Sequence, residues 1–310
     1  MLYTVTPNPT LDKTLGVSAL MPGTIHRAET LRVDFGGKGI NVSRALRALG
    51  IASVCFGFVA GHNGRILSDG LQARDYACKF IEIAGETRQN ITLFDRSKNE
   101  YTKLNEAGPV VTKREFDAFT ALIAQTARAG DLWAFCGSLL PGAPASAYAH
   151  WIDIVQRAGA RAFLDTSGVP LQAGFAARPF ALKVNAEEAG KVLGRELSSD
   201  AQIVEAVREL NHAGIAVAVI TRGAQGIVLG MENTCMLAAL PPIETRSAVG
   251  AGDAAMAGLL WAVQDNCEVQ ETARRITACG AAAAMQEGSE VGDRALVESL
   301  RTRVLLAVAS

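Results

Sequence analysis

The stretch Thr112–Cys136, TKREFDAFTALIAQTARAGDLWAFC, carries the pattern on which the fold of this chain rests. It opens with a capping box, in which the Thr112 hydroxyl and the Glu115 carboxylate satisfy the first free amides of a helix that we expect to run to Gly130. The apolar run Leu132–Cys136 follows directly and predicts a buried β-strand. A helix that leads straight into an apolar strand is the unit from which α/β proteins are built.

The same alternation continues on both sides of this stretch. Sequence patterns predict strands over residues 2–6, 52–58, 161–164, 180–184 and 216–220, and helices over residues 39–49, 147–158 and 201–211. Strands that are almost entirely apolar need cover on both faces, which favours a parallel sheet between helices. The sequence therefore predicts a doubly wound, mostly parallel α/β sheet.

Two segments, residues 13–34 and 87–105, interrupt this alternation. The second contains two β-rich runs on either side of the polar turn Arg96–Asn99, which indicates a small β-sheet. A β-structured insert on an α/β body can serve as a lid that excludes water from reactive phosphates. An ordinary surface hairpin is the alternative.

Composition excludes several classes of function. The 30 Lys and Arg residues balance 31 Asp and Glu residues, so a formal charge of -1 gives no general affinity for nucleic acid or for an anionic membrane surface. The six cysteines form no C-x-x-C pair, which indicates buried thiols in a reducing compartment. Residues 1–7 show no basic region followed by an apolar run, and no stretch approaches about 18 apolar residues without charge, so we expect neither a signal peptide nor a transmembrane helix. We expect a soluble, cytoplasmic protein.

The glycine-rich segment Val249–Gly258 gives the strongest chemical signal. Its glycines leave backbone amides uncovered at the start of an apolar helix, where an anion can bind. A carboxylate at that point, Asp253, suits removal of a proton from a hydroxyl that attacks phosphorus. The alternative is a plain N-cap. Neither the P-loop spacing nor the dinucleotide-binding spacing of glycines is present.

A second glycine-rich turn, Phe35–Arg44, leads into the helix expected over residues 39–49. Lys38 at the helix start could meet an anionic group, and Asn41 could bond sugar hydroxyls. A tight turn with a solvated lysine is the alternative.

Further polar residues follow predicted strands. Arg88 and Asn90 alternate along a strand and so share a face, where the arginine fork suits a phosphate, although a solvated edge charge is the alternative. Asn185 and Glu188 follow an apolar strand and could hold hydrated Mg²⁺ or phosphate, although they could equally cap a helix. Glycine turns at residues 137–142 and 221–226 could line a ligand crevice or be simple loops.

Together these motifs resemble the ribokinase-like (PfkB) carbohydrate kinase family over essentially the whole chain. Gly36–Arg44 and Val249–Asp253 resemble the two signatures of that family. Thr6–Asp12, Thr87–Asn90 and Asn105–Pro109 resemble its hexose-phosphate branch, which includes 1-phosphofructokinase, tagatose-6-phosphate kinase and minor 6-phosphofructokinase.

The resemblance implies a single three-layer kinase domain over residues 1–310, with a small β-sheet lid that could form a homodimer surface. It implies transfer of the γ-phosphoryl group of ATP, with Mg²⁺, to a ketohexose phosphate, preferably fructose 1-phosphate, which would become fructose 1,6-bisphosphate. Tagatose-6-phosphate kinase and 6-phosphofructokinase are close alternatives. A kinase for a neutral sugar or nucleoside, and a non-catalytic sugar-phosphate sensor, are more distant ones.

The resemblance also assigns roles to individual residues. It makes Asp253 the catalytic base, with an anion hole formed by the amides of Gly250, Ala251 and Gly252. The expected sugar-phosphate site consists of Asp12, Arg27, Gly37, Lys38, Asn41, Arg88, Asn90 and Ser138. The expected nucleotide site consists of Lys183, Asn185, Thr221, Gly223 and Gly226, with the adenine near residues 278–288. Glu188 is the expected Mg²⁺ ligand.

Three positions depart from the family pattern. Val184 stands where Pro usually precedes the Asn, Ala107 replaces a frequent Pro, and Ala254 replaces a common Ser. None of these changes removes a reacting group.

Local charge favours a phosphorylated substrate over a neutral one. A neutral sugar or nucleoside needs no cation at its far end, whereas Lys38, Arg88 and Arg27 would supply positive charge in a chain that is otherwise nearly neutral.

Overall fold

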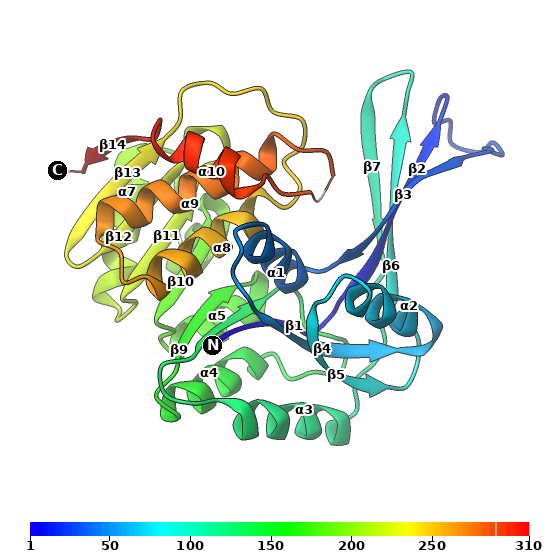
Figure 1. Ribbon diagram of the computed structural model, residues 1–310, viewed down its shortest axis with the longest axis horizontal. Coiled ribbons are helices and arrows are strands. Elements are labelled where there is room, and N and C mark those ends of the chain that lie inside the picture. Colours follow the sequence, from blue (N-terminus) through cyan, green and yellow to red (C-terminus); the bar gives the residue numbers. More distant parts are fainter. Residues whose placement is uncertain (289, 310) are drawn as a thin grey trace.

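The computed structural model describes residues 1–288 and 290–309, and a large mixed sheet runs through its centre (Figure 1). Its ten strands lie in the order β14-β13-β12-β11-β10-β9-β8-β1-β4-β5. Their bounds are β1 (Leu2–Thr6), β4 (Val54–Ala60), β5 (Ala77–Ile83), β8 (Leu132–Cys136), β9 (Arg161–Asp165), β10 (Ala181–Asn185), β11 (Val217–Thr221), β12 (Ile227–Met231), β13 (Thr234–Ala239) and β14 (Leu305–Val308). Neighbours from β5 to β11 pair in parallel, and β12, β13 and β14 continue the sheet antiparallel. The mostly parallel sheet is confirmed.

Helices cover both faces of this sheet. One core lies under α3 (Lys113–Thr126), α4 (Ala147–Arg157), α5 (Gly168–Ala176), α6 (Ala186–Leu193) and α7 (Asp200–His212). The other core lies under α1 (Lys38–Ala48), α8 (Ala251–Gln264), α9 (Val269–Ala284) and α10 (Arg294–Arg301). The predicted three-layer arrangement is therefore confirmed.

Local sequence explains where the predicted helices begin. The capping box at Thr112 and Glu115 is present, with the Glu115 amide bonded to Thr112 and the Thr112 amide bonded to the Glu115 carboxylate. The helix ends at Thr126, four residues before the predicted end, because the backbone at Ala127 turns to an extended conformation. The apolar run after it forms β8 with the predicted bounds.

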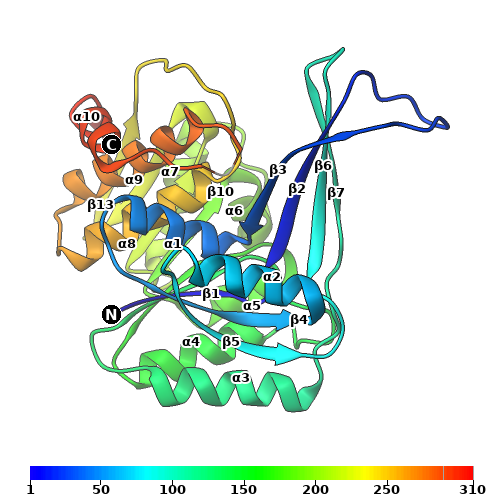
Figure 2. The ribbon, with the colours of Figure 1, turned by 45° about the vertical axis from the view of Figure 1, so that its right-hand side comes forward.

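A second, four-stranded sheet projects from one end of the body (Figures 1 and 2). Its order is β3-β2-β6-β7, with bounds β2 (Thr10–Val17), β3 (Glu29–Gly36), β6 (Arg88–Asp95) and β7 (Glu100–Asn105). We call it the small sheet. Leu11 and Ile40 pack with Leu67 and Leu71 of α2 (Gly61–Gln72), so an apolar cluster fixes the small sheet to the body.

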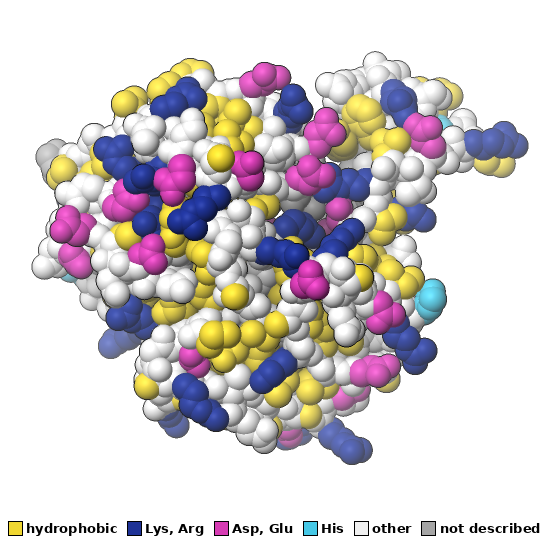
Figure 3. Space-filling view, in the orientation of Figure 1, with side chains coloured by type: hydrophobic (Ala, Val, Ile, Leu, Met, Phe, Trp, Pro, Cys, Tyr) yellow, Lys and Arg dark blue, Asp and Glu magenta, His cyan; other side chains and the backbone are white. Residues whose placement is uncertain are grey.

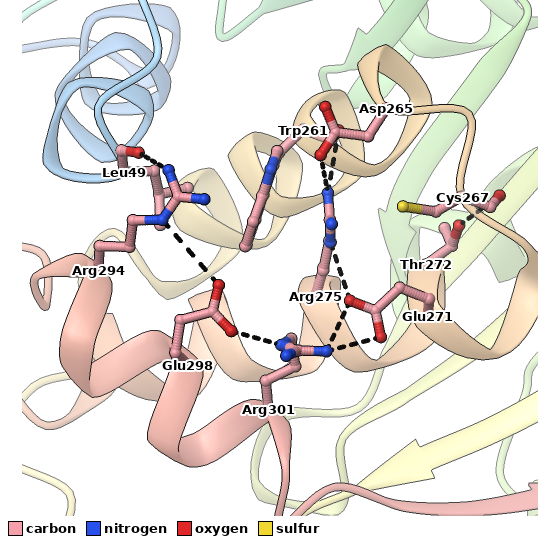
Figure 4. Close-up of polar contacts among 10 residues, drawn as sticks. All are labelled: Leu49, Trp261, Asp265, Cys267, Glu271, Thr272, Arg275, Arg294, Glu298 and Arg301. Atoms are coloured by element: carbon pink, nitrogen blue, oxygen red, sulfur yellow. Dashed lines mark hydrogen bonds and ion pairs between the residues drawn. The ribbon is translucent and has the colours of Figure 1, made fainter.

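An ionic and aromatic cluster fastens the C-terminal helices to the body (Figure 4). The guanidinium groups of Arg275 and Arg294 lie 3.8 and 5.3 Å from the ring centroid of the buried Trp261. Arg301 bonds both carboxylate oxygens of Glu271 at 2.9 Å. Cation–π contacts of this kind contribute about 0.5–2 kcal/mol each. The cluster therefore holds α8, α9 and α10 together. It helps to position the site, because Asp253, the predicted base, lies in the first turn of α8.

The six cysteines are free thiols, and four of them are buried. Cys78 and Cys267 are half-buried, so the predicted burial holds for the other four. Within residues 1–288 and 290–309, no helix is both long enough and apolar enough to cross a bilayer.

Candidate active site

A cavity of about 420 Å³ opens where the carboxyl ends of β9, β10 and β11 face the first turn of α8. Basic side chains gather where the small sheet meets the body, beside this region (Figure 3). The cavity is lined by Lys38, Lys103, Asp165, Lys183, Asn185, Glu188, Thr221, Ala248, Val249, Gly250, Gly252 and Asp253. Ligands of α/β proteins bind at this edge of the sheet.

Asp253 lies buried in the first turn of α8, where its carboxylate accepts a hydrogen bond of 2.8 Å from the side-chain amide of Asn41. Burial and the nearby Asp165 carboxylate raise the pKa of Asp253 to about 6. The Asn41 hydrogen bond and the ammonium groups of Lys38 and Lys183 act in the opposite direction. The result is a carboxylate that is ionised at neutral pH and basic enough to accept a proton.

The Asp165 carboxylate forms ion pairs with two lysines that line the cavity. Its two oxygens lie 2.8 Å from the ammonium groups of Lys38 and Lys183. Burial disfavours the charge of Asp165, but Lys183 and Lys38 outweigh this effect and hold its pKa below the ordinary value. Burial likewise opposes the charge of Lys38, and the Asp165 carboxylate overcomes it and raises the pKa of Lys38. Lys38 therefore presents a fixed positive charge to the cavity, and the Lys183 ammonium lies at the other oxygen of the same carboxylate.

Two charged cavity residues, and also Ala248, were missed by the sequence analysis. Asp165 ends β9, one residue beyond the predicted strand, and an acid directly after an apolar strand is the signal that could have identified it. Lys103 lies on β7 of the small sheet and lines the cavity from the side opposite the body. The sequence around Lys103 contains no motif that predicts a place in the cavity, because its position depends on how the small sheet packs.

The predicted anion hole lies at the N-terminus of α8. Gly250 is the N-cap with a φ of 79°, a left-handed conformation that suits glycine, and Ala251 and Gly252 begin the helix. The Lys183 ammonium nitrogen is 3.5 Å from the point a Cβ atom on Gly252 would occupy. Free helix amides and a lysine therefore face the same space, which favours an anion there.

The start of α1 explains the first glycine motif. Gly37 is the N-cap with a φ of 116°, and a Cβ atom there would lie 2.5 Å from the Thr6 side chain. Only glycine fits, and this tight turn directs Lys38 toward Asp165.

A second polar group lies at the base of the small sheet. Asn90 donates to the Asp12 carboxylate at 3.0 Å, and burial raises the pKa of Asp12. Arg88 donates to the backbone oxygen of Asn8 at 3.0 Å, and the Asn8 amide lies 3.4 Å from the Ser138 hydroxyl. Among the described residues, five buried polar atoms in this region have no hydrogen-bond partner: Thr6 Oγ1, Asn8 Oδ1, Thr10 Oγ1, Arg88 Nε and Asn90 Oδ1. Such groups need a polar partner, which bound water or a ligand can supply.

Asn185 and Glu188 form the helix cap that was the alternative to a binding role. The Asn185 side chain accepts from the Glu188 amide at 2.8 Å, and the Glu188 carboxylate accepts from the Asn185 amide at 2.9 Å. Both residues still line the cavity. One oxygen of Glu188 serves the cap, so the other is available to a hard cation, and Mg²⁺ typically takes one or two protein carboxylates beside phosphate oxygens. The donor set fits Mg²⁺.

Thr221 ends β11 and lines the cavity, but the two glycines expected beside it do not. Gly223 begins the 3₁₀ turn that follows. Gly226 has a φ of 81°, and a Cβ atom there would lie 2.0 Å from the Ala238 carbonyl oxygen, so the turn itself requires this glycine. Arg222, in the same turn, forms an ion pair with Asp200 at 2.6 Å.

Arg27 is not brought to the cavity within this chain. It is exposed in the connection between β2 and β3, beyond the Gly16–Glu29 pair, whereas the opposite end of these strands meets the body. Residues 278–288, expected near the adenine, form the end of α9 and the turn after it. A Cβ atom on Gly280 would lie 3.3 Å from the Ala251 carbonyl oxygen, so this segment lies beside the first turn of α8.

Comparison with known proteins identifies the family. The model of the pfkB family carbohydrate kinases matches residues 10–294. A 1-phosphofructokinase of Rhodobacter capsulatus is 34% identical over 89% of this chain and 88% of its own length. One of Vibrio cholerae is 32% identical over 98% of this chain and 95% of its own length. The solved structure of Escherichia coli phosphofructokinase-2 in complex with fructose-6-phosphate superposes with a TM-score of 0.91 at 25% identity, covering 97% of this chain and 98% of that one.

A carbohydrate kinase moves a phosphoryl group to a hydroxyl of its substrate, so this protein is a phosphotransferase with an alcohol acceptor. The glycine motifs, the buried carboxylate of α8 and the family match agree: the chain belongs to the pfkB family of carbohydrate kinases.

Proposed function

We propose that this protein transfers the γ-phosphoryl group of ATP to a ketohexose phosphate, with fructose 1-phosphate as the preferred acceptor and fructose 1,6-bisphosphate as the product. The observation that carries the proposal is the buried Asp253 at the N-terminus of α8, facing a cavity lined by lysines. The relatives named 1-phosphofructokinase support the choice of acceptor.

Asp253 is the general base of the proposed reaction. Its carboxylate takes the proton of the acceptor hydroxyl as the oxygen attacks the γ-phosphorus. The bond between that phosphorus and the oxygen bridging to the β-phosphate breaks, and ADP leaves. The amides of Gly250, Ala251 and Gly252 and the ammonium of Lys183 stabilise the charge on the transferring group.

The second polar group holds the acceptor. Asp12, Asn41 and Asn90 bond its hydroxyls, and Arg88 and Ser138 bind the phosphate it already carries, with Lys38 between the two ends. The unpaired Arg88 Nε and Asn90 Oδ1 support this assignment, because each would gain a partner from the ligand.

Lys183, Asn185 and Thr221 hold the nucleotide phosphates, and Glu188 supplies a carboxylate ligand to Mg²⁺. Bound Mg²⁺ would neutralise part of the phosphate charge. The small sheet acts as the lid, and Lys103 adds a cation from its side of the cavity.

The exposed face of the small sheet supports a homodimer. Val33, Lys13, Ile91 and Leu104 form one row across the four strands, on the face opposite Asp12 and Asn90. Val33 is 45% exposed and Leu104 is 55% exposed. Three of the four side chains in this row are apolar, which suits a second copy of the same surface.

A coupled ADP-release assay tests the function. MgATP is offered with fructose 1-phosphate, tagatose 6-phosphate, fructose 6-phosphate, fructose and adenosine, and Asp253→Asn is the control. Turnover of fructose 1-phosphate that is lost in Asp253→Asn is the expected result. Turnover of fructose or adenosine would contradict the roles of Arg88 and Lys38, and sugar-phosphate binding without turnover would identify a sensor.

Fructose 6-phosphate is the second candidate acceptor. The superposition on the fructose-6-phosphate complex of the Escherichia coli protein favours it. Turnover of fructose 6-phosphate well above that of fructose 1-phosphate would identify a 6-phosphofructokinase.

A further inference from the structure

Arg44, on the second turn of α1, makes contacts that no part of the proposed reaction has used. Its Nη1 donates to Asn41 Oδ1 at 2.9 Å, and its Nη2 donates to the backbone oxygen of Phe35 at 2.5 Å. The guanidinium therefore spans the space between Asn41 and the end of β3. Its side chain is half-buried, so solvent competes only in part for these bonds.

The chemistry of these groups determines how the Asn41 amide must lie. A guanidinium can only donate, so the atom that Asn41 presents to Arg44 must be its oxygen. The amide nitrogen then points to the other side, where it donates to Asp253 at 2.8 Å. A donor at that position favours the ionised carboxylate, which is the form a general base needs.

The reversed amide would have the opposite effect. An Asn41 side chain rotated by half a turn would present its oxygen to Asp253, and a carboxylate cannot donate to that oxygen unless it is protonated. Such an arrangement would stabilise the protonated form of Asp253, which cannot accept a proton.

We propose that Arg44 is a positioning residue, which fixes the Asn41 amide so that it donates to Asp253 and keeps this carboxylate ready to act as the base. The inference deepens the proposed function and rests on it. Arg44 acts through Asn41 and does not itself touch the substrates. Its bond to the Phe35 oxygen anchors the guanidinium on the backbone of β3, a strand of the small sheet.

Other charged groups face Asp253, and Arg44→Met leaves each of these residues unsubstituted. Asp165 on β9 raises its pKa, while Lys38 on α1 and Lys183 on β10 lower it. Lys103 on β7 and Glu188 on α6 line the same cavity. Because these residues are the same in Arg44→Met, a shift in the pKa of Asp253 is attributed to the loss of Arg44.

The helix offers a matched control. Arg47 lies three residues along α1, is exposed, pairs with Asp75 at 3.5 Å and is not among the residues that line the cavity. Replacing Arg47 by Met removes the same charge from the same helix and leaves the Asn41 amide in place. Arg44→Lys keeps the charge but replaces the planar fork by a single ammonium nitrogen, so we expect a smaller effect from it than from Arg44→Met.

The test measures the titration of Asp253 both directly and through turnover. The direct measurement is a ¹³C NMR titration of aspartate-labelled protein without substrates, in which the Asp253 signal is identified by its absence from Asp253→Asn. We expect a midpoint near pH 6 in the unsubstituted protein. In Arg44→Met we expect the midpoint to rise by about one unit, because a hydrogen bond to the charged form is lost.

The turnover measurement is the pH dependence of kcat with the best acceptor. We expect kcat at pH 7 to fall about twofold in Arg44→Met, because a pKa that rises from about 6 to about 7 leaves only half of Asp253 ionised at that pH. The acid limb should move to higher pH, while Arg47→Met should match the unsubstituted protein. In an Asn41→Ala background, Arg44→Met should add no further shift, because the amide through which it acts is absent.

Several outcomes would overturn the inference. These are an unshifted Asp253 titration in both Arg44 variants, an equal shift in Arg47→Met, or a full additional shift in the Asn41→Ala background. If Arg44→Met does not fold, Arg44→Lys decides the question by the same two measurements. If Asp253→Asn retains full turnover, the proposed function fails, whereas the substrate-free titration still tests whether Arg44 controls Asp253.

Discussion

The side-chain amide of Asn41 donates to the carboxylate of Asp253 at 2.8 Å, although the two residues are 212 positions apart in the chain. Asn41 lies in the first turn of α1 and Asp253 in the first turn of α8, so the starts of two helices meet over the carboxyl edge of the sheet. This contact joins the two glycine motifs of the sequence into one site.

Turnover should fall as the pH drops through about 6. Asp253 must be ionised to accept a proton, and its pKa is raised to about 6 by burial and by Asp165. The acid limb of the kcat/KM profile should therefore lie near pH 6, well above the range of an ordinary aspartate. Asp253→Asn should lower kcat by about 10³-fold. An acid limb near pH 4 in the unsubstituted enzyme would contradict the assignment of Asp253 as the base.

Asp253→Asn should also stabilise the protein at neutral pH. The pKa of Asp253 is higher in the folded state than in the unfolded chain, so the folded state binds more protons and loses stability as the pH rises from about 4 to about 6. An amide has no charge to bury, so thermal unfolding at pH 8 should occur a few degrees higher in Asp253→Asn. At pH 4 the two proteins should differ little. Equal melting temperatures at pH 8 would contradict this prediction, because they would show that the buried charge of Asp253 does not lower the free energy of unfolding.

Asp165→Asn should destabilise the protein and abolish turnover. The substitution leaves Lys38 and Lys183 without their shared carboxylate, and the Lys183 side chain is only 6% exposed. Removing one partner of a buried ion pair costs about 3–5 kcal/mol, which urea unfolding at pH 7 would measure. Asp117→Asn, which breaks the exposed pair with Lys113, is the control and should change stability by less than about 1 kcal/mol. Equal losses in the two variants would rule out a special role for the Asp165 pair.

Arg88→Met should lower kcat/KM for the phosphorylated acceptor by about 10²-fold, because an arginine fork to a phosphate is lost. Steady-state kinetics at varied acceptor concentration would show it, with KM for MgATP unchanged. Arg65→Met, on the exposed surface of α2, serves as the control. If Arg88→Met has full activity, the acceptor carries no phosphate at this position.

The protein should be a dimer in solution, and charges on the small sheet should dissociate it. Leu104→Glu or Leu104→Asp places a carboxylate opposite Ile91 in this exposed row, where a paired copy would bury the charge. Sedimentation velocity should show a monomer for both variants. Val169→Glu, an equally exposed apolar position on α5, should remain dimeric. A monomeric unsubstituted protein would exclude this interface.

Each strand and helix that the sequence predicted is present as that type, whereas the antiparallel strands β12, β13 and β14 were not predicted. Leu2–Thr6 and Leu132–Cys136 form strands with the predicted bounds, because each is a short apolar run between turn residues. The capping residues of α3 and the glycine turns at Gly37 and Gly250 are also local features, since caps and positive φ angles depend on a few neighbouring residues.

Only the tertiary structure decided which side chains meet. Asp165 was identified as a site residue only from the structure. There β9 pairs with β10 in parallel, and the Lys183 ammonium lies 2.8 Å from the Asp165 carboxylate. Lys103 was identified only from the structure, because the small sheet brings it to the cavity. Arg27 was predicted to bind the substrate, but it is exposed at the far end of the same sheet. Sequence patterns report the local preferences of the backbone and the burial of each face. Contacts between distant segments depend instead on how sheets and helices pack, and the electrostatics of the site follow from those contacts.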